Sequence, residues 1–305
     1  MFEGIREDAP ISKGTEGLIA KDTESGLLIQ FRYDQYDAEY LLSGAKKSEF
    51  NEVLSVLKKG LASRNSRADA VAKAFLAATR LWPDANPSDL WTFLINRAYC
   101  DRSNHPSVNA RLNLEQSWKR TSGWALERVL VEHYETFLKT KGLTIKIGSK
   151  VEKESLFSDI DDSRIVPDKA DVLISFVSDG IEQLLGVVHV KASIAERRTD
   201  DVPMSQALIN AGYLSVFWTM DAKSFPSNQP VNRGEFGETD HNQVSEKRRD
   251  FEEHGHFSAC FSYNKNTVPT VSSNNAQARI FVCNFTDPDD DFARFLISAH
   301  CRPVN

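Results

Sequence analysis

The segment DVLISFVSDGIEQLLGVVHVK, residues 171–191, decides the fold that we expect. Two runs of β-forming residues, 171–177 and 183–191, flank Asp179 and Gly180, and an Asp-Gly pair between such runs is typical of a tight hairpin turn. If the two runs pair as antiparallel strands, Asp171 at the start and Lys191 at the end reach the same end of the sheet. The segment therefore predicts a sheet with an aspartate beside a lysine at one end.

The sequence on either side of this hairpin alternates between helix and strand patterns. Apolar residues recur at helical spacing over 115–142, and a strand-like run follows at 143–149. After the hairpin come a helical pattern at 203–212 and a further strand pattern at 213–220. This order predicts an α/β (α+β) fold with a mixed central sheet flanked by helices.

The N-terminal third has a different pattern. A β-like run at 26–33 precedes a stretch, 36–99, in which apolar residues recur mainly at helical spacing. The polar segment 101–113 has the composition of a linker. We therefore predict a mainly helical N-terminal region over 1–110 and a mixed α/β domain over 111–305.

Composition narrows the class of protein. With 305 residues, 41% hydrophobic and 26% charged, the chain has the make-up of a soluble globular protein, and no apolar run is long enough for a membrane helix. The acidic start lacks the apolar core of a secretory signal, and the four cysteines form no CxxC pair, so we expect free thiols in the cytoplasm.

Charge placement is more informative than the net charge of −6, which by itself does not favour binding to nucleic acid. Three local basic clusters could each meet a phosphate: Lys119–Arg120, Arg197–Arg198 and Lys247–Arg249. Each such cluster, taken alone, is more often a solvated surface feature.

The pair Asp171 and Lys191 suits metal-dependent hydrolysis of a phosphodiester. A carboxylate can hold Mg²⁺, which prefers oxygen ligands, and a lysine ammonium can stabilise charge that builds up on the phosphate. The plain alternative is a surface salt bridge at the mouth of a hairpin. Glu127, one position off the apolar stripe of the helix at 115–142, can reach the edge of the buried face and join Asp171 around the metal. Its alternative is an exposed helical glutamate.

These features together resemble a known family. A helix that contains SGWALE (122–127), a KAD tripeptide (169–171) that leads a strand, and a strand that ends on Lys191 resemble the core of type II restriction endonucleases with the PD-(D/E)XK motif. The similarity is greatest to the CCGG-cutting, BsaWI-type group and extends over about residues 115–225. The resemblance implies that Glu127 and Asp171 bind Mg²⁺ and that Lys191 is the catalytic lysine.

The sequence departs from the family motif near Lys191. The residue two positions before the lysine is His189, so the usual acid is absent. Relatives supply this acid from the following helix, at positions that here are Met204 and Ser205. Two substitutes are available, Asp200 and Asp201, of which Asp201 is our candidate metal ligand. The site could also work with Asp171 and Glu127 alone, and Asp168 in the literal PD dipeptide competes with Asp171.

The segment after Lys191 is the candidate reader of DNA sequence. KASIAER (191–197) is similar to the stretch with which the related enzymes read guanine and cytosine, with Ala195 in place of an arginine. Glu196 can accept from cytosine and Arg197 can donate to guanine in the major groove. Ser193 is a further DNA contact, and Arg198 would bind a phosphate. The alternative is a charged loop that caps the next helix.

Taken together, the sequence predicts an Mg²⁺-dependent type II restriction endonuclease whose nuclease domain spans 111–305. It would act as a homodimer on a short palindrome in double-stranded DNA with a CCGG core, because a palindrome matches two-fold symmetry. The resemblance also implies a partner DNA methyltransferase. Two alternatives stay open: a nuclease of the same fold that acts in repair or on branched DNA, and a non-catalytic DNA-binding or scaffold protein.

Overall fold

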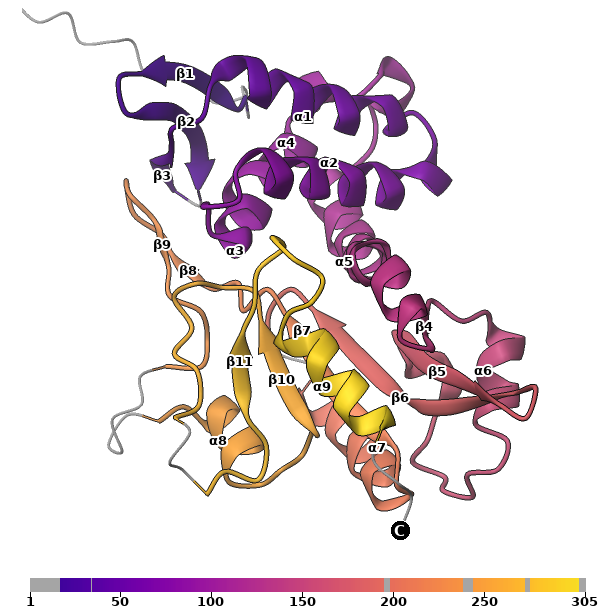
Figure 1. The fold of residues 1–305 in the computed structure, drawn as a ribbon. Coiled ribbons are helices and arrows are strands. Elements are labelled where there is room, and N and C mark those ends of the chain that lie inside the picture. Colours follow the sequence, from indigo (N-terminus) through magenta and orange to yellow (C-terminus); the bar gives the residue numbers. More distant parts are fainter. Residues whose placement is uncertain (1–16, 34, 195–197, 238–243, 272–274, 302–305) are drawn as a thin grey trace, which may run out of the picture.

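A six-stranded mixed sheet forms the centre of the molecule (Figure 1). The computed structural model describes residues 17–33, 35–194, 198–237, 244–271 and 275–301. The strand order is β11-β10-β7-β6-β5-β4; β4, β5 and β6 pair antiparallel, whereas β6, β7, β10 and β11 pair parallel. The strands are β4 (Leu143–Lys146), β5 (Val172–Ser178), β6 (Ile181–Lys191), β7 (Leu214–Thr219), β10 (Ala259–Ser262) and β11 (Ile280–Val282).

The β5–β6 hairpin confirms the prediction made from the opening segment. Val172 pairs with Val188, and the strands turn at Asp179 and Gly180, whose φ angles are 52° and 77°. Two consecutive positive φ angles are the signature of the hairpin turn that an Asp-Gly pair favours. Asp171 directly precedes β5 and Lys191 ends β6, so the antiparallel pairing brings both residues to one end of the sheet.

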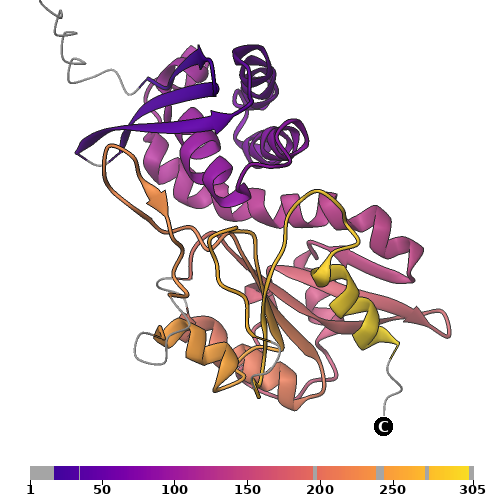
Figure 2. The ribbon, with the colours of Figure 1, turned by 60° about the vertical axis from the view of Figure 1, so that its left-hand side comes forward.

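Helices cover both faces of this sheet (Figures 1 and 2). Helices α5 (Leu114–Thr140) and α9 (Asp291–His300) pack on one face, where Val188 and Trp218 share a buried cluster with Leu126 and Phe292. Helices α7 (Arg198–Asn210) and α8 (Glu246–Glu252) lie on the other face. The alternation of side chains along β6 therefore sends neighbouring residues to opposite helix layers.

The N-terminal part combines a small sheet with helices. Strands β1 (Ile19–Thr23), β2 (Gly26–Tyr33) and β3 (Tyr36–Ser43) form an antiparallel meander beside the helices α1 (Lys47–Gly60) and α2 (Arg67–Leu81). The chain then forms α3 (Pro87–Asp89), a π-helical turn (Leu90–Ile95) and α4 (Asn96–Cys100). The helical reading of 36–43 was wrong, because Ala38 and Leu42 are buried while Glu39 and Leu41 point outward, which is strand periodicity in a short segment.

The linker predicted at 101–113 was also wrong. Two short 3₁₀ turns, Arg102–Asn104 and Ser107–Asn109, pack this segment against the helices. Asn104 and Asn109 are buried and donate to backbone carbonyls, Asn109 to Leu61 O at 2.8 Å. The polar composition serves internal hydrogen bonds here, which composition alone does not distinguish from solvation.

The remaining elements connect these parts. Helix α6 (Lys150–Leu156) follows β4, and the hairpin of β8 (Ser224–Phe225) and β9 (Val231–Asn232) extends toward the N-terminal sheet, where Glu39 N donates to Asn228 O (Figure 2). All four cysteines are free thiols, as predicted. Within the described ranges, none of the helices combines the length and the apolarity needed to cross a bilayer.

Candidate active site

Asp171 and Lys191 form an ion pair at the end of the sheet. Lys191 Nζ donates to Asp171 Oδ2 at 2.7 Å, and the backbone N–H of Val190 donates to the same oxygen at 2.8 Å. The two side chains are 20% and 16% exposed, so solvent screens the pair only in part. The hairpin register therefore fixes this aspartate from two sides.

Asp201 supplies a second carboxylate from α7. Helix α7 begins at Arg198, five residues before the predicted start, so Asp201 lies in its first turn. Asp201 Oδ2 is 3.5 Å from Lys191 Nζ, and its side chain is 9% exposed. The ammonium of Lys191 thus lies between two carboxylates that come from different elements.

His189 occupies the position at which the family motif has its acid. His189 lies two residues before Lys191 and so on the same face of β6. It is buried, its Nε2 is 3.0 Å from Ser215 Oγ, and burial lowers its pKa to about 4, which leaves it neutral at pH 7. Its Nδ1 is 4.0 Å from Asp201 Oδ1. Asp201 therefore brings a carboxylate to the place where an acid at position 189 would have projected.

The charge of Lys191 is held in place by its partners. Burial works against the ammonium, but the charges of Asp171 and Asp201 outweigh burial and raise the pKa of Lys191. The side chain is therefore a cation and a hydrogen-bond donor, and it has no free lone pair with which to act as a base.

Glu127 is the third carboxylate that the sequence singled out. It lies on α5 and is half-buried, and burial followed by repulsion from Asp171 raises its pKa to about 7. The cations of Lys153 and Lys191 lower the pKa but do not offset burial. Glu127 is thus close enough to Asp171 to be destabilised by it, which is the situation of carboxylates that share a cation site.

The donor set suits Mg²⁺ more than a metal that needs a full protein cage. In the part of the chain that the structure describes, no group of three or more His, Cys, Asp or Glu side chains is close enough to hold a metal by itself. Mg²⁺ is commonly bound by one or two carboxylates, with waters and substrate phosphates completing its shell. Asp171 and Asp201 beside one ammonium, with Glu127 near, provide that kind of hard oxygen set.

The competing acid positions are elsewhere. Met204 is buried in the core under α7, and Ser205 donates to His256 O at 2.6 Å, so neither position substitutes for an acid. Asp168 is exposed in a 3₁₀ turn, Pro167–Lys169, ahead of the strand. Asp171, rather than Asp168, makes the contact with Lys191.

Most of the predicted base-reading residues cannot be placed. Glu196 and Arg197 lie outside the described residues. The structure describes Arg198 only as the first residue of α7, and Ser193 as a half-buried residue just after β6. Their roles stay predictions.

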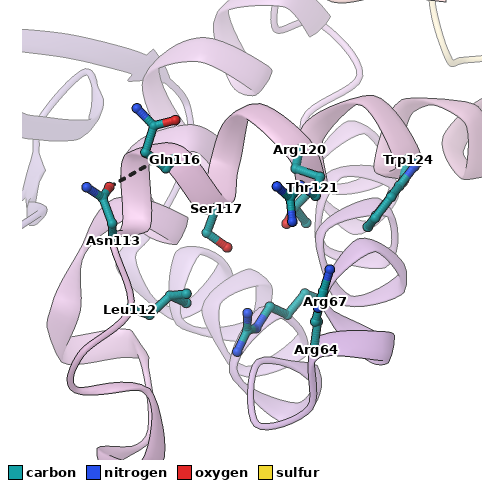
Figure 3. Close-up of a pocket in the computed structure, with 9 residues that line it drawn as sticks. All are labelled: Arg64, Arg67, Leu112, Asn113, Gln116, Ser117, Arg120, Thr121 and Trp124. Atoms are coloured by element: carbon teal, nitrogen blue, oxygen red, sulfur yellow. Dashed lines mark hydrogen bonds between the residues drawn. The ribbon is translucent and has the colours of Figure 1, made fainter.

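Some residues of the basic clusters form ion pairs within the fold, whereas others are exposed beside a cavity. In the cluster 247–249, Lys247 pairs with Glu235 and the buried Arg248 donates to Glu252 at 2.7 Å, so both are engaged within the fold. Arg120 instead is exposed and borders a cavity together with Arg64 and Arg67 (Figure 3). Sequence reasoning missed Arg64 and Arg67, because they are far from Arg120 in the chain and form no cluster with it.

Carboxylates and a lysine at the end of a mixed sheet, where a strand hairpin meets a helix, suit the class of nucleases that work with a divalent cation. The comparisons with known proteins identify the family within that class. The chain is 36% identical over 277 residues to the type II restriction enzyme AgeI of Thalassovita gelatinovora, a match that covers 86% of this chain and 95% of the relative. The chain therefore belongs to the type II restriction enzymes, which are site-specific deoxyribonucleases.

One solved structure supports this assignment. The crystal structure of a specific complex of AgeI with DNA matches with a TM-score of 0.79 at 32% identity, over 89% of this chain and 99% of that one. A pre-specific complex of BsaWI with DNA matches at 17% identity with a TM-score of 0.41, over 82% and 92% of the two chains. No family model matches the chain. The restriction-endonuclease fold predicted from the sequence is confirmed by the AgeI structure.

Proposed function

We propose that this enzyme uses Mg²⁺ to hydrolyse one phosphodiester in each strand of a short palindromic DNA site with a CCGG core. The observation that carries the proposal is the ammonium of Lys191 between Asp171 and Asp201 at the end of the sheet. Because the chain belongs to the type II restriction enzymes and holds this cluster, we set aside the two alternative functions, a non-catalytic DNA-binding protein and a repair nuclease.

Asp171, Asp201 and Glu127 are the residues that would hold the cation. When bound, Mg²⁺ acidifies a water molecule and offsets the negative charge that develops on the phosphate. The raised pKa of Glu127 fits this role, because a carboxylate that is partly protonated near pH 7 becomes fully charged once a cation is its neighbour. Glu127 would therefore lose its proton to solvent if a cation bound beside it.

Lys191 acts as a fixed positive charge. Its raised pKa keeps it protonated, so it donates to the scissile phosphate and to the attacking water rather than removing a proton. Asp171, held by Val190 N, keeps the ammonium aimed at the end of the sheet. This rigid attachment lets the lysine favour the transition state without reorganising.

The segment that follows Lys191 would read the sequence. Glu196 would accept from cytosine N4 and Arg197 would donate to guanine O6 and N7, while Ser193 and Arg198 add contacts to the DNA. Because this segment lies between Lys191 and Asp201, a rearrangement on a correct site would be transmitted to both partners of the ion-pair cluster.

The oligomeric state, the roles of the two regions of the chain and the partner enzyme are also proposals. A homodimer would match a palindrome, and residues 1–110 would supply dimer contacts or reach flanking base pairs, with the nuclease domain over 111–305. A DNA methyltransferase of the same specificity would protect the host DNA in a prokaryotic cytoplasm.

The test is incubation of plasmid DNA with the protein and Mg²⁺, followed by sequencing of the fragment ends. Discrete bands with ends that map to one palindrome containing CCGG are expected, and addition of EDTA should stop the cutting. Discrete ends at a palindrome without CCGG would contradict the proposed core. Cutting that continues in EDTA would contradict the role of Mg²⁺.

A further inference from the structure

Three arginines from separate segments converge on one cavity of about 310 Å³. We name it the arginine cavity. Arg64 lies in the 3₁₀ turn Arg64–Ser66 just before α2, Arg67 is the first residue of α2, and Arg120 lies across from them on α5 (Figure 3). Among the residues that the structure describes, no Asp or Glu lines this cavity. In a chain with a net charge of −6, such a concentration of unopposed positive charge needs an explanation.

The arginine cavity is built into the fold. Asn109, which is fixed through its bond to Leu61 O, accepts from Arg67 Nη2 at 2.8 Å and so holds this guanidinium in place. Arg67 Nε is buried and has no hydrogen-bond partner within the described part of the chain. A buried donor without a partner costs free energy, so this guanidinium is held in place without all of its hydrogen bonds being made.

Several polar side chains around the arginine cavity already have hydrogen-bond or ion-pair partners, whereas Arg64 and Arg120 are exposed. The hydroxyls of Ser117 and Thr121 on α5 are both within hydrogen-bond distance of Tyr99 OH, at 2.6 and 3.2 Å. Arg128, next to the cavity, is paired with Asp69 at 2.8 Å. Arg64 and Arg120 form no ion pair among the described residues, and guanidinium groups bind phosphate with two parallel hydrogen bonds.

The cavity and the candidate active site share one face of α5. Gln116, Arg120, Gly123 and Glu127 follow the spacing i, i+4, i+7 and i+11, which places them on one side of a helix. At about 1.5 Å per residue, Arg120 lies roughly 10 Å along the axis from Glu127. Since DNA carries one phosphate per strand for about 3.4 Å of its axis, that length corresponds to about three nucleotides.

Gly123 leaves this face open between the two sites. Apart from the backbone of α5 itself and the neighbouring residues, a Cβ atom at Gly123 would meet no atom of the described residues within 4 Å. Glycine inside a helix lowers stability by about 1 kcal/mol relative to alanine, so helix stability does not account for a glycine at this position. A bare backbone on the face between Arg120 and Glu127 lets a DNA strand approach α5 closely.

We propose that the arginine cavity binds a phosphate of the DNA backbone, within about three nucleotides of the bond that is cut. This inference rests on the proposed function, since it assumes that the scissile phosphate lies beside Glu127 and Lys191. The contact orients the strand and carries no sequence information, because every nucleotide has the same phosphate.

The first experiment measures duplex affinity by fluorescence anisotropy in EDTA, as a function of salt, for the double variant Arg64→Gln/Arg120→Gln. Both side chains are exposed, so the fold should tolerate the change. The slope of log K against log salt should fall by about 1 to 2, and affinity should drop to a similar extent for cognate and unrelated duplexes. The matched control Lys139→Gln/Arg294→Gln removes the same charge from exposed positions elsewhere and should leave the slope nearly unchanged.

The second experiment locates the phosphate. Duplexes with a single neutral methylphosphonate at each of the three phosphates on either side of the scissile bond are titrated with both proteins. The wild type should lose affinity at one of these positions, and the double variant should lose none there, because its contact is already gone. Equal losses in both proteins would overturn the proposal.

A third variant tests the open face of α5. Gly123→Leu should leave the melting temperature equal to or above that of the wild type, since leucine favours helix, while duplex affinity falls. Unchanged affinity would mean that no DNA strand passes this face, and would overturn the proposed path.

Other outcomes also decide the question. If inorganic phosphate raises the melting temperature of the wild type but the double variant keeps the wild-type salt slope on DNA, the cavity is a site for a small anion and the proposal fails. If the wild type itself neither binds nor cuts duplex DNA, the proposed function fails. If the wild type cuts DNA at discrete sites but the double variant has the same salt slope as the wild type, the proposed function stands and the proposed phosphate site is wrong.

Discussion

Two lysines of the central sheet each lie between two carboxylates, yet only one belongs to the candidate active site. Lys146 on β4 contacts Glu152 at 3.1 Å and Glu182 at 2.8 Å. Lys191 on β6 contacts Asp171 at 2.7 Å and Asp201 at 3.5 Å. In both cases the surrounding carboxylates raise the pKa of the lysine against the effect of burial. Charge pairing alone therefore does not identify a catalytic lysine.

The two sites differ in exposure and in charge balance. Glu152 and Glu182 are 47% and 39% exposed, against 20% and 9% for Asp171 and Asp201, so water screens the first group far more. Hydrogen bonds from Ser149 lower the pKa of Glu152 to about 2, with a further contribution from Lys146. The Lys146 site is thus complete without any ligand.

The Lys191 site has one carboxylate too many. Glu127 approaches a site in which Asp171 and Asp201 already share the ammonium, and its pKa is raised to about 7 by burial and by Asp171. A further cation would remove that penalty. The comparison teaches that a site of this type is recognised by a carboxylate without a cationic partner of its own, next to an ion pair whose charges already offset each other.

The largest expected effect is on the two lysines themselves. Lys191→Ala should lower the rate of DNA cleavage by roughly 10²- to 10⁴-fold, because a fixed donor to the developing charge is lost. Lys146→Ala, which also removes a lysine between two carboxylates of the same sheet, should cut at nearly the wild-type rate. The measurement is single-turnover cleavage of an oligonucleotide duplex that carries the mapped site.

Binding separates the two possible causes of a loss. In EDTA, Lys191→Ala should still bind the cognate duplex more tightly than an unrelated one, and its melting curve should remain cooperative. A cleavage rate equal to that of the wild type would remove Lys191 from the mechanism, and an equal loss for Lys146→Ala would make the comparison between the lysines meaningless.

The next effect concerns the acid that replaces the missing one in the motif. Asp201→Asn should lower cleavage by about 10- to 100-fold and raise the Mg²⁺ concentration needed for half-maximal rate, because a ligand oxygen loses its charge. Asp200→Asn is the matched neighbour and should have little effect on either quantity. The reverse order of effects would assign the role to Asp200.

Sequence was sufficient for the hairpin because local chemistry determines it. Asp179 and Gly180 favour a two-residue turn, and that turn sets the pairing from Ser178 with Ile181 as far as Ser175 with Leu184. Beyond that point a β-bulge shifts the pairing by one residue, so the contact between Asp171 and Lys191 at 2.7 Å also depends on an irregularity that the turn does not predict. The fold class was predictable because helix and strand patterns alternate along residues 115–220.

Sequence did not decide between Asp200 and Asp201 because that choice depends on where α7 begins. A helix that started at 203, as predicted, would leave both residues in a loop; the start at Arg198 places Asp201 in the first turn, near Lys191. The arginine cavity was hidden for a related reason, since Arg64 and Arg120 border the same cavity only because α2 packs against α5. Boundaries and long-range packing are set by tertiary contacts rather than by local pattern.

A smaller effect should appear in the pH dependence of stability without metal. In EDTA, Glu127 holds its proton up to about pH 7 in the folded state, but only to about its ordinary value of 4.5 in the unfolded chain. The folded state then binds more protons between these two values, so stability falls as the pH rises through that window. Glu127→Gln should lose this decline and gain on the order of 1–2 kcal/mol over the wild type above pH 7.

Urea unfolding of both proteins at several pH values measures this difference. Glu132→Gln, at an exposed position of the same helix, is the matched control and should differ from the wild type by the same amount at every pH. With Mg²⁺ and cognate DNA bound the advantage of Glu127→Gln should disappear, because the cation removes the penalty. If the stability difference between Glu127→Gln and the wild type did not change with pH, the pKa of Glu127 would not be raised in the folded state.

The smallest effect is expected at the Lys146 site, and it sharpens the contrast with Lys191. A double-mutant cycle on Lys146 and Glu152, measured by urea unfolding in EDTA, should give a weak coupling, as for other solvent-exposed ion pairs. The coupling should shrink in high salt because the exposed carboxylate is screened. The same cycle on Lys191 and Asp171 should give a larger coupling with a weaker salt dependence, since both side chains are mostly buried. Equal couplings would mean that burial does not distinguish the two lysines, and the unbalanced charge of Glu127 would then have to account for the whole difference between them.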